Sequence, residues 1–590
     1  MSLDIARSIA FSGLSAAQVQ ISVASSNIAN ADTAGYTEKI ANQASSVTAG
    51  VGTGVVVTGI TSTVDRLLLK SLVGATSDLG SADTINSYMA ELAQLYGSTG
   101  SSDGSTAGTS LANTLASLES ALSSLASSPS SASLQSNAVS ALGDVATQLR
   151  ETSSSIQKLR ANADQDISSS VDDVNKDIQQ IADLNAEIRQ QAAAGQSTAD
   201  LEDQRNTALQ DIASQMNVSY YTASNGDLQV YTSSGQALVD GSAHTLSYTP
   251  AANVTASTSY SSDTSTGFSA ITVNGVDITS QISSGKVGAL ITLRDQTLPA
   301  AQSQLDQLAQ QLASSLNAVS NAGTSVPPPA SLTGTTTVSS ATALSATGTV
   351  RLAVTDQSGN LVSYQDLNLS SYATVGDLVT AINGISGLSA SIDSNGHLSI
   401  TATGSGDGVA INEMTSSIGS GGAGFSDYFG LNDLVTATGA SDFAVRSDIL
   451  SGAAALPAAT LDSSATLTVG SQVLSSGSTI INALYDKLTG STSFAAAGGL
   501  SATTSSFADY AATIVANAAN KATQASAVYT AKETAQSTYA SSLSSESGVN
   551  LDQESSRLSS LQNEYTAASE LIQVINTMFT SLMTAMQATA

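Results

Sequence analysis

The two ends of this 590-residue chain carry the same apolar repeat. From Leu551 onward, apolar residues recur at alternating steps of three and four, the spacing of a helix with one apolar face. That face comprises Leu558, Leu561, Tyr565, Ala568, Ile572, Ile575, Phe579, Leu582 and Met586. Near the N-terminus the same spacing is kept by Leu3, Ala10, Leu14, Ala17, Ile21, Ala24 and Ile28. Because a single stripe is marginal in water, we expect the two terminal helices to cover each other, so that the chain folds back on itself.

The pattern alone leaves open what else these stripes contact. An ordinary intramolecular core is the simplest interpretation, and the alternative is that the paired termini also pack against neighbouring molecules. Small residues of the N-terminal helix, such as Ala6, Gly13 and Ala16, would let other helices approach closely on several faces. On that alternative the contact residues are Leu14, Ile21, Ile28, Leu558, Leu561, Tyr565, Ile572, Ile575, Phe579 and Leu582.

Composition excludes several classes of function. The chain has 47 acidic and 18 basic residues and a formal net charge of −29, which repels nucleic-acid phosphates and anionic membrane surfaces. No segment approaches the roughly 18 to 20 uninterrupted apolar residues of a membrane helix. The amphipathic N-terminus, interrupted by Asp4 and Arg7, does not resemble a cleaved secretory signal. Cysteine is absent, so no disulfide framework or thiolate site exists. We therefore expect no nucleic-acid partner and no membrane insertion.

The periodicity of the chain predicts a multidomain protein that is mainly α with β-rich insertions. Helical spacing covers 79–95, 111–125, 134–194, 200–216 and 286–319, whereas strand-like text covers 50–60, 218–238, 271–275 and most of 348–411. We expect the N- and C-terminal helices to pair as a coiled coil, with a helical bundle in the middle and β domains outside. The expected domains are 1–75 with 508–590 (terminal coiled coil), 76–217 with 283–325 and 412–507 (bundle), 218–282 (small β domain) and 330–411 (inserted β-rich domain).

No group of residues carries the marks of a catalytic, cofactor or metal site. The histidines His244 and His397 stand alone in strand or turn text, without the partners of a triad or a metal triplet. Gly419 to Gly424 spells G-x-G-x-x-G, but aromatic loop text follows it, so a flexible linker is favoured over a dinucleotide site. Asp393 begins a segment like a calcium loop, yet Gly404 occupies the position of the essential glutamate, which favours a hairpin turn. We expect no cofactor and no enzymatic activity.

Motifs at both ends resemble a known family. Residues 25–37 read SSNIANADTAGYT, with Asn27, Asn30, Gly35 and Tyr36, and this is similar to the N-terminal signature of flagellar axial proteins of the rod and hook. The family usually has proline where this chain has Ala34. Residues 52–60 with Asp65 are similar to the segment that follows, and residues 548–554, with Asn550 and Leu551, resemble the signature that opens the last helix.

Three internal segments resemble the hook-associated members of that family. These are residues 200–205 (DLEDQR), residues 293–299 (LRDQTLP) and residues 424–433 (GFSDYFGLND) with the following 445–449. The motif residues of the last segment are Phe425, Tyr428, Phe429, Gly430, Leu431, Asn432 and Asp433. Together with the end motifs, these matching segments are spread over most of the chain outside 330–410.

The resemblance implies a structural junction subunit at the extracellular end of the bacterial flagellar hook. It implies a ring of copies that contacts the hook protein on one side and a second hook-associated junction protein and the filament on the other. It also implies export through the flagellar type III apparatus without a cleaved signal peptide, with a cytoplasmic chaperone on the C-terminal helix. The alternatives are a hook or rod subunit within the family, and a secreted adhesin whose β-rich insertion is a binding module.

Overall fold

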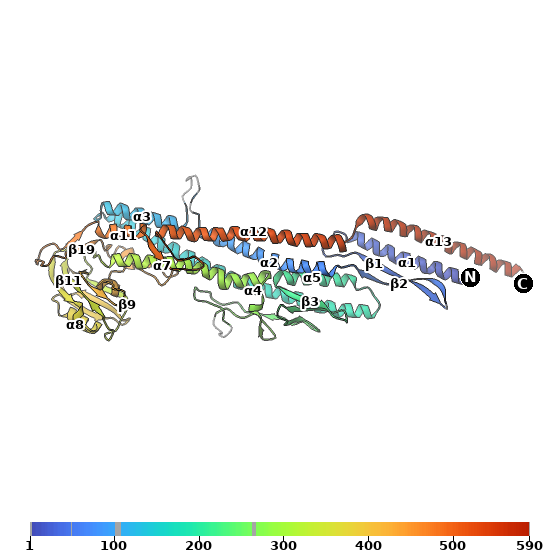
Figure 1. Cartoon of the computed structure of the whole chain (residues 1–590), viewed down its shortest axis with the longest axis horizontal. Helices are drawn as coiled ribbons and strands as arrows, with labels where there is room; N and C mark the ends of the chain where they lie inside the picture. Colours follow the sequence, from blue (N-terminus) through green and yellow to red (C-terminus); the bar gives the residue numbers. More distant parts are fainter. Residues whose placement is uncertain (1–2, 49, 99, 101–107, 262–266, 589–590) are drawn as a thin grey trace.

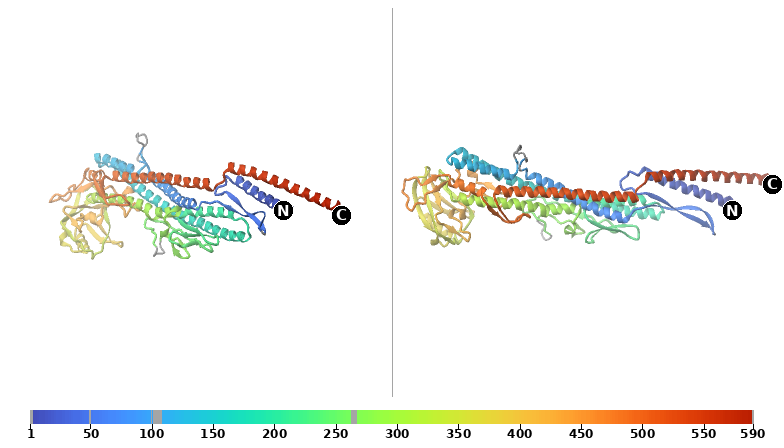
Figure 2. Two further views of the ribbon diagram at one scale, coloured as in Figure 1. Left: turned by 45° about the vertical axis from the view of Figure 1, so that its right-hand side comes forward. Right: turned by 45° about the horizontal axis from the view of Figure 1, so that its top comes forward.

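The computed structural model describes residues 3–48, 50–98, 100, 108–261 and 267–588, and it is elongated (Figure 1). The chain leaves through helix α1 (Leu3–Ala29) and returns through helix α13 (Leu551–Ala588), which lie side by side at one end of the molecule. A helical bundle forms the middle, and a β-rich part lies at the other end (Figure 2). The predicted class, mainly α with β-rich insertions, is confirmed.

The bundle is built around one very long helix. Its members are α2 (Arg66–Leu95), α3 (Leu111–Ser127), α4 (Ala132–Ala193), α5 (Ala199–Gln215), α6 (Gly285–Thr292), α7 (Leu298–Ser320), α11 (Thr479–Thr489) and α12 (Phe507–Ser547). Helix α4 has 62 residues, a length of about 90 Å at 1.5 Å per residue. Val171, Val174, Ile178 and Ile181 form one helical stripe that is buried along it. Because α4 is much longer than the other helices, several of them together are needed to cover its apolar stripe.

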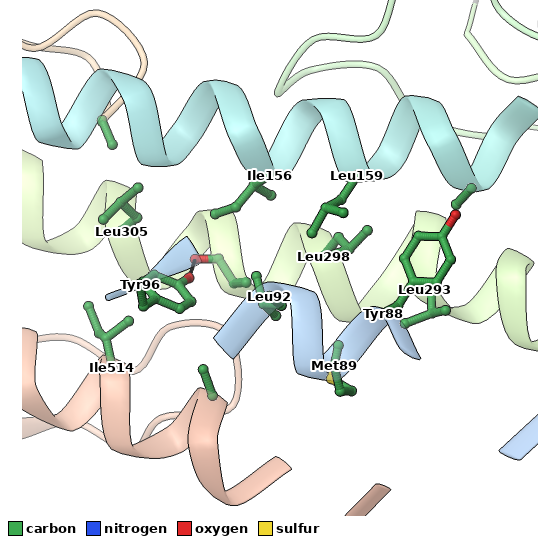
Figure 3. Packing of buried hydrophobic residues seen from close by; sticks show 14 of the residues in the cluster. Tyr88, Met89, Leu92, Tyr96, Ile156, Leu159, Leu293, Leu298, Leu305 and Ile514 are labelled. Atoms are coloured by element: carbon green, nitrogen blue, oxygen red, sulfur yellow. Dashed lines mark hydrogen bonds between the residues drawn. The ribbon is translucent and has the colours of Figure 1, made fainter. Parts of the chain in front are cut away.

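One core runs through the bundle and joins segments that are remote in sequence (Figure 3). Leu92 and Tyr96 of α2 and its C-terminal cap lie between Ile156 of α4, Leu305 of α7 and Ile514 of α12. Since α12 packs along α2, its first half belongs to this bundle core. The predicted domain boundaries stay a prediction. The prediction assigned 508–590 to the terminal domain, whereas the first half of α12 shares the bundle core.

The helical segment expected at 286–319, with Pro299 starting or kinking a helix, is divided in two near that proline. Helices α6 and α7 are separated by a π-helical turn at Leu293–Thr297, and Pro299 lies in the first turn of α7. Proline has no N–H to continue the hydrogen-bond ladder, which is the physical reason for the change of pitch. The freed carbonyl of Arg294 accepts a hydrogen bond from Arg160 Nε at 3.0 Å. The Arg294 side chain is fully buried and donates to Asp164 at 3.0 Å.

Small sheets lie against the bundle. Strands β3 (Val218–Thr222), β4 (Leu228–Thr232) and β5 (Ala237–Val239) form one, and β6 (Leu246–Ser247), β7 (Thr272–Val273) and β8 (Val276–Asp277) form another. Asn225-Gly226 and Asn274-Gly275, dipeptides typical of hairpin turns, connect β3 to β4 and β7 to β8. Asn274 and Gly275 have φ of 52° and 78°, as a two-residue hairpin turn requires.

The β-rich insertion has a core of its own. Its two main sheets have the strand orders β12-β11-β15 and β13-β14-β9, and helix α8 packs with them. The bounds are β9 (Ser331–Thr337), β11 (Thr349–Asp356), β12 (Leu361–Asn368), α8 (Val375–Asn383), β13 (Leu388–Ile392), β14 (His397–Ala402) and β15 (Asp407–Asn412). Phe425, Phe429 and Leu431 also belong to this core, although they follow residue 411, where the sequence placed the boundary.

Short elements complete the outer part of the chain. They are β10 (Ala346–Thr347), β16 (Ser417–Ile418), α9 (Phe425–Phe429), β17 (Val435–Thr436), β18 (Ala444–Val445), α10 (Ser447–Leu450), β19 (Ala459–Leu461), β20 (Leu474–Ser476), β21 (Thr492–Phe494) and β22 (Thr503–Ser505). The glycine-rich segment expected as a flexible linker is instead an ordered turn. Ile418 and Ala423 bridge across it, while Gly419 and Gly422 adopt φ of 69° and 67°.

A β-hairpin lies beside the terminal helices. Strand β2 (Val51–Ser62) contains the predicted strand, and β1 (Lys39–Thr48), which the sequence did not predict, pairs with it in antiparallel register. Strand β1 reads KIANQASSVT, in which polar and small residues hide the alternation. Helix α1 packs against both strands.

From the contact between α4 and α5 we predict that Asp177 affects the stability of the bundle in a pH-dependent way. Burial, with neighbouring Asp211 and Asp173, raises the pKa of Asp177 to about 6. An acid whose pKa is higher in the folded than in the unfolded chain opposes folding above that pKa, and the effect disappears as the pH falls below its ordinary value. We expect Asp177→Asn to stabilise the bundle by on the order of 1 kcal/mol at pH 8, discounted for partial exposure, and by almost nothing at pH 4.

Urea unfolding at the two pH values measures this difference. Asp172→Asn, on the exposed face of the same helix, removes an equal charge and serves as the control. Equal stabilisation of both variants at pH 8 would contradict the assignment to Asp177.

Candidate subunit-contact site

Helices α1 and α13 run antiparallel. Arg7, near the start of α1, lies over the ring of Phe579, with 5.9 Å between the guanidinium carbon and the ring centroid. Leu3 shares a groove with Val574 and Met578. At the other end, the strand that follows α1 meets the first turns of α13 through Glu38 and Arg557. The expected pairing of the termini is therefore present, and α13 extends beyond α1 (Figure 1).

The predicted seam residues are covered to different degrees. On α13, Leu561 and Ile575 are buried, Leu558, Ile572 and Phe579 are half-buried, and Tyr565 and Leu582 are exposed. On α1, Leu14, Ile21 and Ile28 are half-buried. The fully buried apolar residues of α1 are Ala10, Ala16, Ala17, Val23 and Ala24, because this helix lies between α13 and the β1–β2 hairpin.

A second apolar face of α13 is only partly covered within the described chain. Leu571, Val574, Met578 and Leu582 are 50%, 56%, 54% and 49% exposed. The spacing of these residues, by three, four and four, is again that of one helical face. Large exposed apolar patches mark interaction sites, since monomers rarely leave them uncovered. Of these four residues, the sequence pattern pointed only to Leu582, because the spacing of this face overlaps that of the main seam.

Long stretches of the terminal helices carry no charged side chain. Residues 571–590 contain no Asp, Glu, Lys or Arg, and neither do residues 8–31, although the chain as a whole carries a net charge of −29. Copies of such an acidic molecule repel one another. The two segments can approach other copies without that repulsion, which makes them the best candidates for subunit contact.

The N-terminal motif residues form the joint at the end of α1. The Asn27 side chain is buried and bonds both the N–H and the carbonyl of Lys39, at 3.1 and 3.0 Å, and accepts from the Tyr36 hydroxyl at 3.0 Å. Asn30 Nδ2 donates to the carbonyl of Ser26 at 3.0 Å. Gly35 has φ of 79°, and a Cβ there would lie 2.7 Å from Thr207 Oγ1. The motif therefore turns the chain from α1 into β1.

The C-terminal motif starts the last helix. Asn550 Oδ1 accepts from the N–H groups of Asp552 and Gln553, both at 3.1 Å, and so caps the first turn of α13. Leu551, the first residue of the helix, is 47% exposed.

The motif at 425–433 attaches the β-rich insertion to the end of α7. Phe425 and Phe429 pack edge to face in the insertion core, with ring centroids 5.3 Å apart, and Tyr428 packs against Phe429. Asn321, which caps α7, accepts from the Asn432 N–H at 2.8 Å and donates to Asp433 at 2.7 Å. These bonds cross from the bundle to the insertion, so this motif is a structural joint. The sequence did not single out Asn321.

The described residues offer no chemistry beyond these structural roles. His244 and His397 pair with Asp240 and Asp393, at 3.0 and 3.7 Å. Across the ranges that the structure covers, no three His, Cys, Asp or Glu side chains gather to hold a metal ion. Within the same ranges, no helix is sufficiently long and apolar to cross a membrane.

Three segments match families of flagellar proteins. Residues 102–330 match the family model of the flagellar hook-associated protein FlgK helical domain, residues 8–37 that of the flagella basal body rod protein, and residues 349–404 that of the flagellin hook IN motif. These models describe parts of the flagellum, and the similarity to a structural flagellar protein supports the prediction that the chain is not an enzyme. In these segments the chain is similar to flagellar axial proteins.

Within that class the resemblance is to flagellar hook-associated protein 1, as the motifs predicted. The Salmonella typhimurium protein of that name is 26% identical over 319 residues, covering 52% of this chain and 55% of that protein. The Escherichia coli protein is 25% identical over 323 residues, covering 53% and 56%. The chain thus spans about half the length of the curated relatives that it matches.

A solved structure, the flagellar hook junction protein FlgK from Burkholderia pseudomallei, aligns with 80% of this chain and 98% of its own. The TM-score is 0.47 at 17% sequence identity.

The joint at 425–433 makes a prediction about stability. Gly430 has φ of 68°, and a Cβ there would lie 2.1 Å from Thr335 Oγ1. Gly430→Ala should cost about 2 kcal/mol or more, because the left-handed backbone disfavours alanine and the Thr335–Asp433 hydrogen bond is displaced. Chemical unfolding of the full chain measures the loss. Gly421→Ala is the control, since no atom lies within 4 Å of its added Cβ and its φ is not in the left-handed region; equal losses in the two variants would contradict the prediction.

Proposed function

We propose that this protein is a structural subunit of the junction between the flagellar hook and the filament, and that filament assembly requires it. The observation that carries the proposal is the match of residues 102–330 to the helical domain of a hook-associated protein, on a chain whose terminal helices pair with each other. The partners that follow are copies of itself in a ring, the hook protein, the second junction protein and the filament. The proposed location is extracellular, at the hook–filament junction, after export without a cleaved signal peptide.

The mechanism of assembly rests on the terminal helices. The predicted seam holds α1 to α13, and the uncovered residues Leu571, Val574 and Met578 are left for a helix of another subunit. Burying such side chains contributes about 1.5–3 kcal/mol each relative to leaving them exposed. The same face would bind the export chaperone before assembly, so that chaperone and neighbouring subunits would compete for it.

A deletion strain tests the junction role. Cells that lack the protein should carry hooks of normal length without filaments, as seen by electron microscopy, and the full chain supplied in trans should restore filaments. Residues 8–37 also match the rod protein model, so a hook or rod subunit is the alternative function to be tested. Loss of the hooks themselves would favour that alternative and contradict the junction role.

Charges on the uncovered face test the assembly mechanism. Val574→Asp combined with Met578→Asp should leave the monomer folded, since both side chains are about half exposed, but should reduce assembly at least 100-fold. Filament counts in the complemented deletion strain measure assembly, and circular dichroism of the purified chain measures folding.

Two further variants complete this experiment. Val574→Leu combined with Met578→Leu keeps the face apolar and should support normal filaments. Removal of residues 571–590 should abolish assembly and chaperone binding while the bundle stays folded. Normal filaments from either the charged or the truncated variant would contradict a role of this face in assembly.

A further inference from the structure

Three connecting segments meet between the bundle and the terminal helices: residues 30–38, 63–65 and 548–550. The Glu38 N–H donates to the carbonyl of Ser547 at 2.8 Å, and the Asp65 N–H donates to the Ser547 hydroxyl at 3.2 Å. Ser547 is 2% exposed. The segments 30–38 and 63–65 are therefore both tied to the last residue of α12, which directly precedes the segment 548–550.

Lys39 ties the start of β1 to the bundle. Its ammonium contacts Asp203 of α5, the Thr37 hydroxyl at 3.0 Å and the carbonyl of Ala199 at 3.3 Å. Asp203 in turn accepts from the Thr37 N–H at 3.0 Å and the Thr37 hydroxyl at 2.7 Å. The side chains of Lys39 and Asp203 are only 5% and 8% exposed. With three acceptors around the ammonium, the hydrogen-bonding capacity of Lys39 is filled.

Glu38 ties the same strand to α13. Arg557 lies 3.8 Å from the Glu38 carboxylate and 3.5 Å from that of Glu554. Glu554 is 2% exposed, and its Oε2 has no hydrogen-bond partner among the described residues. Burial, and then the carboxylate of Glu554, raises the pKa of Glu38. One guanidinium thus serves two carboxylates, one from the strand and one from the helix.

We propose that the dipeptide Glu38-Lys39 positions the paired terminal helices relative to the bundle. Successive side chains of an extended strand point to opposite sides, so Lys39 reaches α5 while Glu38 reaches α13. Hydrogen bonds and buried ion pairs are directional, whereas apolar contacts are not. A buried ion pair adds little net stability over an apolar pair of the same shape, but removing one partner leaves an uncompensated charge. The Lys39–Asp203 pair therefore contributes mainly to the orientation of the terminal helices relative to the bundle.

The absence of cysteine from the chain allows a direct test. Spin labels on Ser169→Cys of α4 and Gln562→Cys of α13, both exposed, report the distance between bundle and terminal helices in the full chain. The native background should give one narrow distance distribution. Lys39→Met should at least double its width, and hydrogen exchange of the amides at 36–39 should rise at least tenfold.

Two further variants separate positioning from stability. Lys532→Met breaks an ion pair of α12 with Asp78 of α2, 2.7 Å long and about half exposed, and should leave the distribution narrow. Lys39→Met combined with Asp203→Leu removes both buried charges, so its unfolding midpoint should lie above that of Lys39→Met alone while the distribution stays broad.

A narrow distribution in the folded double variant would overturn the proposal. So would equal broadening by Lys39→Met and Lys532→Met. The measurement uses the free chain in solution, so its outcome is independent of the proposed role at the hook–filament junction.

Discussion

Pairing of α1 with α13 is the constraint on which the rest of the structure depends. Because these helices are the two ends of the chain, everything between them must leave and return through one place. The bundle follows the same rule, with α2 leaving along the path by which α12 returns. The entropic cost of closing such long loops grows only slowly with their length, so large insertions at the far end are tolerated. The β-rich insertion at that end has its own core, and the joint around Asn321 attaches it to the bundle.

Charge is distributed in a way that suits this arrangement. The chain is strongly acidic, yet its terminal segments carry almost no charge. The few cations that are buried lie where elements from distant parts of the sequence meet. Lys39 joins the first strand to α5, Arg294 joins the π-helical turn to α4, and Arg351 lies fully buried in the insertion beside Asp366. Ion pairs of this kind demand exact partners, which makes them suited to joints rather than to general stabilisation.

Much of the fold could be predicted from local pattern. The buried stripe of α4, the turns at Asn225-Gly226 and Asn274-Gly275, and the two terminal helices each follow from spacing or turn chemistry within a few residues. Strand β1 could not be predicted, because its polar and small side chains carry no alternation and β2 supplies its order by pairing. Asp203 illustrates the same limit. In sequence it is one of several acids near a helix N-terminus, and only the fold gives it Lys39 as a partner.

The sequence by itself determined the elements, their apolar faces and the family that the end motifs resemble, because each depends on residues close together in the chain. Tertiary structure alone decided which part of each face is covered. The stripe on α13 is continuous in sequence, yet α1 covers Ile575 and leaves Val574 and Met578 exposed. Which residues are covered depends on the direction and length of a helix more than 500 residues away in the sequence, and no local pattern encodes such a contact.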